Sequence, residues 1–199
     1  MVGDNKISWR APIIPSISLA GIPIGLDVVD FDNLLELYLI DSGSLLYKFE
    51  ESPVLRLAKH ESDFESIYLF HVHDVEMTNW RLYFASPNHA GVNTKALAVI
   101  FRNGSVHAVK VWNFELAKEG MKPKNVYSGR LPGGIGLDDP VNCLLQYTDL
   151  QFDEGEGWFY TDENYGGVEV TGYGDLADYP DQTIMAIAVI ARSPVQSED

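Results

Sequence analysis

The segment Phe70–Met77 reads FHVHDVEM and contains the residue types that bind metal ions in proteins. His71 and His73 are separated by one residue, so on a β-strand their side chains point to the same face. Asp74 and Glu76 add two carboxylates, which are also zinc ligands. His71 and His73 are therefore the metal-ligand candidates of this chain. A metal-dependent hydrolase that uses this pair, with Asp74 or Glu76, is one hypothesis for its function.

The wider pattern around these two histidines is incomplete. Zinc needs three or four ligands, and the hydrolase pattern H-x-H-x-D-H would place Asp and His where the sequence has Val75 and Glu76. In a cupin-like pattern, H-x-H is followed by Glu after three or four residues, but here only two residues separate His73 from Glu76. The remaining histidines form no companion motif: His60, His89 and His107. The sequence therefore favours an ordinary half-buried strand, and we predict no bound metal.

Signatures of nucleophilic catalysis and of phosphate binding are missing from the sequence. There is no G-x-S-x-G, and the single cysteine, Cys143, falls on the apolar side of a predicted helix. The Gly-rich stretches Leu131–Gly136 and Asn164–Glu169 match no phosphate-binding loop. The run DEGEG at Asp153–Gly157 lacks the spacing of a calcium loop and is typical of a polar hairpin turn. We predict that the protein is not an enzyme and has no cofactor.

Negative charge is concentrated in the C-terminal third of the chain. The formal net charge is -15. Residues 131–191 contain no Lys, Arg or His but twelve acidic residues: Asp138, Asp139, Asp149, Asp153, Glu154, Glu156, Asp162, Glu163, Glu169, Asp175, Asp178 and Asp181. A field of one sign repels nucleic acid and anionic membranes, and it speeds the encounter with a basic partner. We therefore expect no nucleic-acid or membrane partner.

The same acidic segment is rich in aromatic side chains, which dominate the energetics of protein interfaces. They are Tyr147, Phe152, Trp158, Phe159, Tyr160, Tyr165, Tyr173 and Tyr179. Acidic residues interleaved with aromatic residues are typical of a recognition surface, although some of these rings must belong to the core. An acidic surface that only keeps the protein soluble is the alternative interpretation.

Length and composition predict one large domain or two small, tightly joined lobes. The chain has 199 residues, of which 46% are hydrophobic and 22% are charged. A lone cysteine excludes an internal disulfide and fits a reducing compartment. The stretch APIIPSISLAG follows Lys6 and Arg10 as in a secretory signal, but prolines interrupt it and Asp4 lies in the basic region. We expect a cytoplasmic protein.

The distribution of apolar and turn residues predicts a fold of short antiparallel strands with two helices. The clearest element is a hairpin over Lys95–Asn113, with Asn103 and Gly104 in its turn. Helices are expected at Asp30–Leu39, with Asp30 as N-cap, and at Asp138–Tyr147, with a proline in the first turn. Further strands are expected at Leu45–Glu51, Val54–His60, Ser66–Val75, Trp80–Ser86, Gly157–Thr161, Gly167–Tyr173 and Thr183–Arg192.

Two similar segments suggest an internal repeat. Gly21–Asp27 reads GIPIGLD and Gly134–Asp138 reads GIGLD, and each precedes a predicted helix and then an aromatic strand. We therefore expect an α+β fold, mainly antiparallel β-sheet, made of two similar helix-plus-sheet lobes. The expected lobes are residues 1–92 and an acidic lobe of residues 93–199, or else one continuous compact domain.

The C-terminal half resembles the immunity proteins encoded beside bacterial polymorphic toxins, including those of contact-dependent growth-inhibition systems. The resemblance is carried by the succession of AVIFRNGSVHAVKVW, YSGRLPGGIGLDDPVNCLLQY, FDEGEGWFY and GGVEV. In arrangement the chain is also similar to tandem helix-plus-sheet inhibitors of the β-lactamase-inhibitor type. The resemblance implies a small cytosolic protein that binds and neutralises a co-encoded toxin domain, often over its active site. Many such toxins are nucleases with cationic substrate sites.

The acidic and aromatic residues around the predicted second hairpin are the candidates for binding such a toxin. They are Asp149, Asp153, Glu154, Glu156, Trp158, Asp162, Glu163 and Tyr165. Charge pairs would drive fast association, and buried aromatic anchors would slow dissociation. The alternatives are the hydrolase with His71 and His73, and a carbohydrate-binding β module that uses Trp158 and neighbouring tyrosines.

Overall fold

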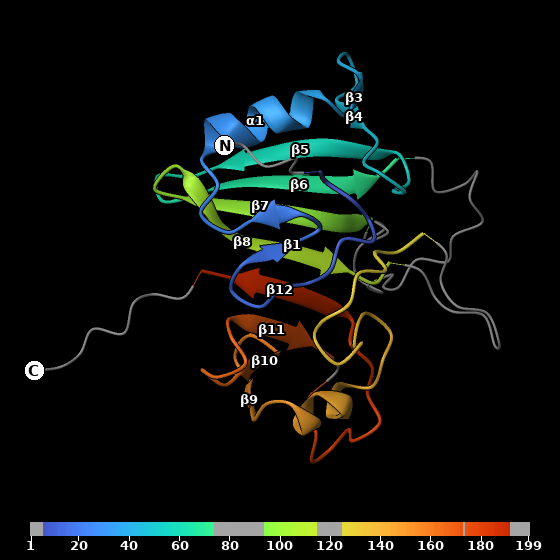
Figure 1. Ribbon diagram of the computed structural model, residues 1–199, viewed down its shortest axis with the longest axis vertical. Coiled ribbons are helices and arrows are strands. Elements are labelled where there is room, and N and C mark those ends of the chain that lie inside the picture. The colour runs from blue at the N-terminus through green and yellow to red at the C-terminus, as the bar shows by residue number, and fades with distance from the viewer. Residues whose placement is uncertain (1–5, 74–93, 115–124, 173, 192–199) are drawn as a thin grey trace, which may run out of the picture.

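The protein is built around one antiparallel sheet of ten strands (Figure 1). The computed structural model describes residues 6–73, 94–114, 125–172 and 174–191. From one edge to the other the strands are β3 (Leu39–Asp41), β4 (Leu46–Tyr47), β5 (Leu55–Glu61), β6 (Ser66–Val72), β7 (Lys95–Arg102), β8 (Ser105–Trp112), β12 (Ala186–Ile190), β11 (Val168–Thr171), β10 (Trp158–Thr161) and β9 (Leu150–Asp153). The short strands β1 (Ser18–Leu19) and β2 (Ile22–Pro23) form a separate pair. The predicted class, mainly antiparallel β-sheet with two short helices, is confirmed.

The hairpin of β7 and β8 lies in the middle of the sheet. Its turn residues Asn103 and Gly104 have φ angles of 51° and 75°, the left-handed conformation that these two residue types adopt most readily. Pairing of Arg102 with Ser105 closes the hairpin. β6 and β12 then extend the sheet on either side.

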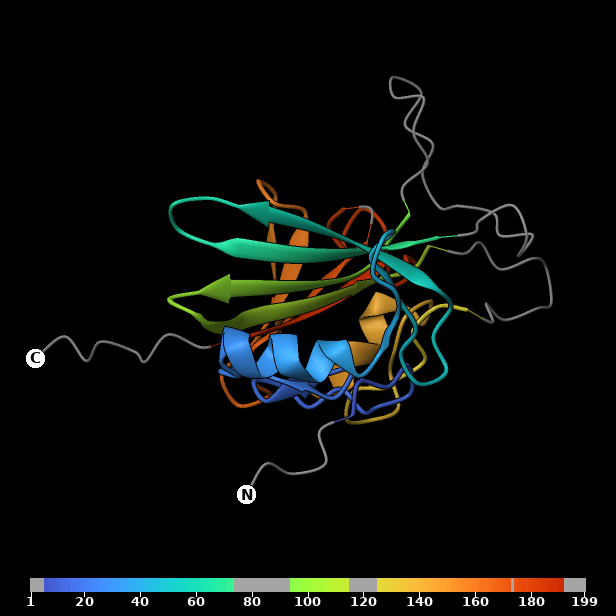
Figure 2. The ribbon, with the colours of Figure 1, turned by 90° about the horizontal axis from the view of Figure 1, so that it is seen from above.

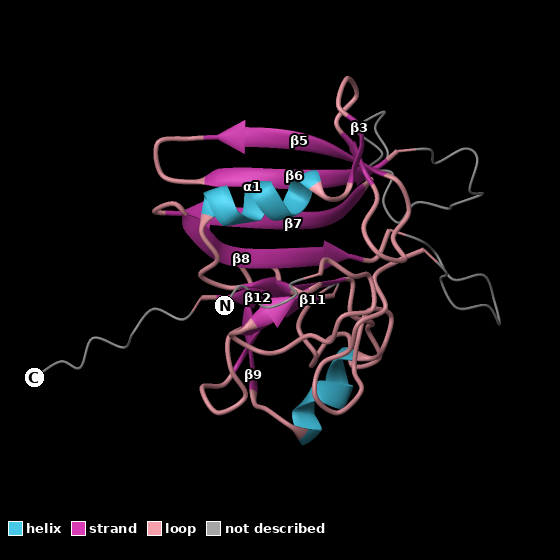
Figure 3. Cartoon of the chain, turned by 45° about the horizontal axis from the view of Figure 1, so that its top comes forward, coloured by secondary structure: helices cyan, strands magenta, loops and turns pink. Residues whose placement is uncertain are grey.

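The core fills the space between one face of the sheet and a layer that contains α1 (Val28–Glu36) and the N-terminal segment (Figure 2). α1 turns Phe31 and Leu35 towards the sheet, and both are buried. The N-terminal segment adds Trp9, whose ring is 2% exposed. Because side chains alternate between the faces of a strand, the residues between the core positions point to the opposite face. Figure 3 shows α1 lying over β6 and β7 and running roughly along these strands, where Phe31 packs against Tyr68 and Phe101.

α1 begins earlier and ends earlier than its sequence predicts. Asp27 is the N-cap, and its side chain accepts a hydrogen bond from the N–H of Val29 (2.8 Å), so the prediction of Asp30 as N-cap is wrong. Asp30 instead occupies the first turn, where a negative charge is favourable. Asp32 connects the helix to the sheet, because its carboxylate accepts a hydrogen bond from Tyr68 (3.2 Å) and pairs with Lys59 (3.4 Å).

The second predicted helix is a 3₁₀ helix, η2 (Val141–Gln146), and is shorter than expected. It buries Val141 and Leu144, which are three residues apart as the 3₁₀ repeat requires. Pro140 occupies the N-cap with no side-chain hydrogen bond, and the N–H of Val141 donates to the carbonyl of Gln182 (2.9 Å). This tether to the segment before β12 replaces an ordinary helix start.

The expected pair of helix-plus-sheet lobes is not confirmed, because one continuous sheet crosses the middle of the chain through the pairing of β6 with β7. The expected boundary between residues 92 and 93 lies outside the described residues. The similar segments also differ in structure. GIPIGLD supplies β2 and the N-cap of α1, whereas GIGLD forms a loop before η2.

Most predicted strands are confirmed with changed ends, and the changes have local causes. Leu45–Glu51 shortens to β4: Leu45 adopts a φ angle of 52°, which does not fit an extended strand, and Glu50 forms an isolated bridge with Ser8. The predicted strand Trp80–Ser86 lies outside the described residues. The short strands β1, β2, β3 and β9 were not predicted.

Within the described ranges, no helix has both the length and the apolar character needed to span a membrane.

Candidate functional site

The hairpin of β9 and β10 presents the acidic candidates at one edge of the sheet. Asp153 builds its turn: the carboxylate accepts hydrogen bonds from the N–H groups of Gly155 (2.8 Å) and Glu156 (3.1 Å). Gly157 closes the turn with a φ of 72°. Asp153, Glu154 and Glu156 are all exposed, so this turn projects three carboxylates into solvent.

Asp162 organises the other end of the hairpin. Its carboxylate accepts hydrogen bonds from the N–H groups of Asp149 (3.0 Å), Asn164 (2.7 Å) and Tyr165 (3.0 Å). These bonds, with that of Asp149 first, lower the pKa of Asp162 from its ordinary value. The Asp162 side chain therefore holds the loop and offers little further bonding capacity to a partner. Asp149 and Glu163 lie beside it and are exposed.

Replacing Asp162 by alanine should destabilise the protein, whereas replacing the exposed neighbour Glu163 should have a much smaller effect. The lowered pKa means that the ionised carboxylate favours the folded state. This contribution is present above the ordinary pKa of 3.8 and is lost as the pH falls through the lower folded value. Urea unfolding of both variants over a pH series measures this contribution. A loss of stability in Asp162→Ala that persists in strong acid would contradict the role of the ionised Asp162 carboxylate.

Trp158 lies on the face of the sheet opposite the core, next to the ion pair of Lys110 and Glu169. The ammonium of Lys110 is 3.6 Å from Glu169 Oε2 and 4.7 Å from the centre of the Trp158 ring. Lys110 and Glu169 lie on β8 and β11, and Ala188 of β12 lies between them in register. The small side chain of Ala188 lets Lys110 reach across the intervening strand.

Burial changes the acid–base properties of the groups around Trp158. Glu169 is 8% exposed, and burial raises the pKa of its carboxyl although Lys110 acts in the opposite direction. Tyr160 donates a hydrogen bond to Glu156 (3.0 Å), and burial together with the neighbouring carboxylates raises the pKa of Tyr160 to about 12. Tyr160 is therefore a neutral hydrogen-bond donor throughout the physiological range.

Tyr165 is partly a core residue. It packs against the buried cluster, and its hydroxyl donates a hydrogen bond to the carbonyl of Pro132 (3.3 Å). Burial raises the pKa of Tyr165 to about 12. Among the aromatic candidates, Trp158 thus contributes to the open sheet face and Tyr165 supports the loop.

The eight predicted residues fall into two groups at opposite ends of one hairpin. Asp153, Glu154, Glu156 and Trp158 surround the turn, and Asp149, Asp162, Glu163 and Tyr165 surround the far loop. Sequence reasoning missed Lys110 and Glu169. Their signal was present: each is a charged residue at an outward position of an otherwise apolar strand.

The two histidines of the metal hypothesis have different surroundings. His71 Nδ1 lies 2.9 Å from Thr94 Oγ1. Burial, then Lys95, Arg56 and His60, lower the pKa of His71. His73 lies near Asp41, whose pKa is lowered first by the N–H of Gly43 and least by His73.

Positive neighbours oppose the binding of a divalent cation at His71. The residues described hold no cluster of three or more His, Cys, Asp or Glu that could bind a metal ion. Asp74 and Glu76 lie outside the described residues. The hydrolase hypothesis stays a prediction, and its test is zinc content with and without His71→Ala.

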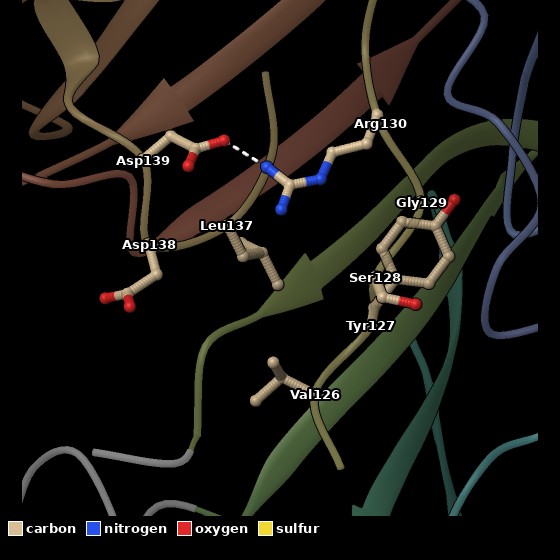
Figure 4. A pocket seen from close by; sticks show the side chains of 8 residues that line it. All are labelled: Val126, Tyr127, Ser128, Gly129, Arg130, Leu137, Asp138 and Asp139. Atoms are coloured by element: carbon tan, nitrogen blue, oxygen red, sulfur yellow. Dashed lines mark hydrogen bonds and ion pairs between the residues drawn. The ribbon is translucent and has the colours of Figure 1, made fainter. Parts of the chain in front are cut away.

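A cavity of about 140 Å³ lies between residues 126–130 and residues 137–139 (Figure 4). Arg130 and Asp139 form an ion pair across it, and Asp139 also accepts a hydrogen bond from the N–H of Gly136 (2.8 Å). Ser128 donates to the carbonyl of Trp9 (3.3 Å). These polar groups hold chain segments together, and the residues that line the cavity contain no nucleophile paired with a base.

Comparisons of this chain with protein-family models, with curated proteins and with solved structures find no match.

Proposed function

We propose that this protein is an immunity protein, which binds and neutralises a co-encoded basic toxin domain of the nuclease type. The observation that carries the proposal is the charge distribution: residues 131–191 contain twelve acidic residues and no Lys, Arg or His. Two of the twelve, Asp139 and Glu169, form ion pairs with Arg130 and Lys110. The exposed carboxylates of this set give the segment a negative field that would attract a cationic partner.

The hairpin of β9 and β10 is the proposed contact surface. Its exposed carboxylates, Glu154, Glu156 and Glu163, would steer a basic surface towards the edge of the sheet. Trp158 and Tyr160 lie half-buried on the adjacent face and would supply apolar contact area after the encounter. A phosphate-binding cleft has the complementary charge. An acidic surface bound in such a cleft would exclude the nucleic-acid substrate of the toxin. Because a nuclease toxin would act in the cytoplasm, we propose that the protein binds it there.

Charge reversal at the hairpin tests this proposal. Glu154→Lys combined with Glu163→Lys avoids Asp153 and Asp162, which hold the turns. We expect the double variant to keep its stability and to bind the partner about 10- to 100-fold more weakly at low salt, mainly through slower association. Tagged wild-type and variant proteins serve as baits at low salt in a lysate of the cells that produce this protein. The association rate of the captured basic protein with each bait is then measured.

A matched control separates the surface from the total charge. Glu61→Lys combined with Asp63→Lys changes the net charge equally, and both residues are exposed at the turn between β5 and β6. This control should retain the partner. Equal retention by both double variants would show that the hairpin is not the contact surface. The proposed function itself would be contradicted if the lysate is shown to contain a basic toxin domain and the wild-type bait captures no basic protein from it.

A further inference from the structure

η2 and the segment 174–182 expose apolar side chains in the acidic third of the chain. Leu145 of η2 is 54% exposed, and Tyr179 in the segment is 52% exposed. The side-chain N–H of Asn142 donates to the carbonyl of Pro180 (3.0 Å), so η2 lies against this segment. Leu145 follows Asn142 by one turn of a 3₁₀ helix, so both side chains point to the same side. Leu145 therefore faces the segment that carries Tyr179, and the two side chains belong to one surface.

Glycines hold two tyrosine rings of this surface in place. A Cβ atom on Gly133 would lie 2.5 Å from the ring of Tyr147, the C-cap of η2. A Cβ atom on Gly174 would lie 2.9 Å from the ring of Tyr179. Each ring therefore packs directly on the backbone, where a larger residue would displace it. Tyr147 is 47% exposed, so both rings also present a large part of their surface to solvent.

The buried side chain of Gln182 fixes the segment that carries Tyr179. Gln182 is 3% exposed, and its side-chain NH₂ group donates to the carbonyls of Gly174 (2.6 Å) and Tyr179 (3.0 Å). Its side-chain oxygen accepts a hydrogen bond from the N–H of Gly174 (3.3 Å). The backbone carbonyl of Gln182 accepts from Val141 of η2, so the same residue ties the segment to η2. A surface that is fixed before binding loses less conformational entropy when a partner binds.

Carboxylates border the apolar side chains. Asp178 and Asp181 are exposed on either side of Tyr179, and the exposed Asp149 follows Tyr147 by two residues. A tyrosine ring beside a carboxylate suits arginine, because a guanidinium can stack on the ring and bind both carboxylate oxygens. A lysine ammonium makes neither contact as well, since it is a compact point charge. We call this set of residues the η2 surface: Leu145, Tyr147, Asp149, Asp178, Tyr179 and Asp181.

The η2 surface is continuous with the hairpin of β9 and β10. η2 ends at Gln146 and β9 begins at Leu150, so only three residues separate them. Figure 1 shows η2 and the segment 174–182 at the end of the molecule where β9 and β10 lie. One partner can therefore contact the hairpin and the η2 surface together.

We propose that the η2 surface binds arginine side chains of the basic toxin and is the apolar anchor of that interface. This inference rests on the proposed function and names the chemistry that the surface recognises. The exposed carboxylates of the hairpin steer the encounter, whereas Leu145, Tyr147 and Tyr179 slow dissociation, because half-exposed aromatic rings supply large contact area once they are covered.

Dissociation kinetics test the anchor. Leu145→Ser combined with Tyr179→Ser should make the captured basic protein dissociate at least about tenfold faster and leave its association rate almost unchanged. The hairpin variant Glu154→Lys with Glu163→Lys has the opposite signature, because it slows association. Leu37→Ser combined with Phe64→Ser is the matched control, since these side chains are 77% and 87% exposed and lie outside the acidic third. The control should dissociate like the wild type.

A small probe tests the preference for arginine without the toxin. NMR titration with N-acetyl-argininamide should give saturable shifts of the Tyr147 and Tyr179 rings. N-acetyl-lysinamide, which carries the same charge, should bind at least about twofold more weakly. Asp178→Asn combined with Asp181→Asn should weaken binding of the arginine probe and keep the protein folded.

The outcomes separate this proposal from the proposed function. Unchanged dissociation from Leu145→Ser with Tyr179→Ser, alongside weaker binding to the hairpin variant, would overturn the anchor and leave the proposed function standing. Equal shifts with both probes would overturn the preference for arginine. If the wild-type protein captures no basic protein from a lysate shown to contain a basic toxin domain, the proposed function fails and the anchor fails with it.

Discussion

Replacing Trp9 by alanine is expected to lower the free energy of unfolding by about 3–5 kcal/mol, a large fraction of the stability of a domain of this size. The ring is 2% exposed and packs against Phe49 and Tyr127, with centroids 6.4 and 5.9 Å away. Its indole N–H donates to the carbonyl of Asn125 (2.8 Å). The substitution thus removes a large buried ring and the hydrogen bond that its N–H donates to the Asn125 carbonyl.

Equilibrium unfolding in guanidinium chloride measures this loss. Leu37→Ala is the control, because Leu37 is 77% exposed and its truncation should change stability by less than about 0.5 kcal/mol. If Trp9→Ala cost no more than Leu37→Ala, the N-terminal segment would not be part of the cooperative core.

Replacing Lys110 by methionine is expected to destabilise the protein by about 2–3 kcal/mol near neutral pH, because Glu169 would keep a buried charge without its partner. The stem of methionine preserves most of the packing against Trp158. The pKa of Glu169 is already raised above its ordinary value of 4.5, and loss of Lys110 should raise it further. An acid with a raised folded pKa gains stability as the pH falls through that value. The deficit of Lys110→Met should therefore shrink in mild acid.

Unfolding of the wild type and of Lys110→Met between about pH 8 and about pH 5 measures this dependence. Adding Glu169→Gln to Lys110→Met removes the titrating group and should make the deficit smaller and independent of pH. A deficit of Lys110→Met that stays constant over this range would show that Glu169 is not the group responsible.

The long strands could be predicted from sequence, because they are runs of apolar and β-branched residues bounded by turn residues. β7 and β8 are two such eight-residue runs joined by an Asn-Gly turn, β6 is a seven-residue run, and β5 begins with alternating buried and exposed residues. Short strands such as β3 and β9 have too few residues for a period to appear, and the pairing of neighbours defines them. The start of η2 depends on a hydrogen bond between Val141 and Gln182, which lies 41 residues later in the chain.

The candidate surface could be predicted as a region but not residue by residue. Charge counting located the acidic hairpin, because net charge is a property of composition. Composition alone does not distinguish Glu154, which is exposed, from Asp162, whose carboxylate accepts hydrogen bonds from three backbone N–H groups.

The position of β12 in the sheet has a consequence for how this protein is made. β12 is the last described strand in the chain, yet it pairs with β8 on one side and β11 on the other. Until β12 has left the ribosome, β8 and β11 each have an unpaired edge. The part of the sheet from β3 to β8 and the part from β11 to β9 are then not joined. The nascent chain must therefore complete its fold after synthesis of this strand, and during that interval its open edges are available to chaperones or to other chains.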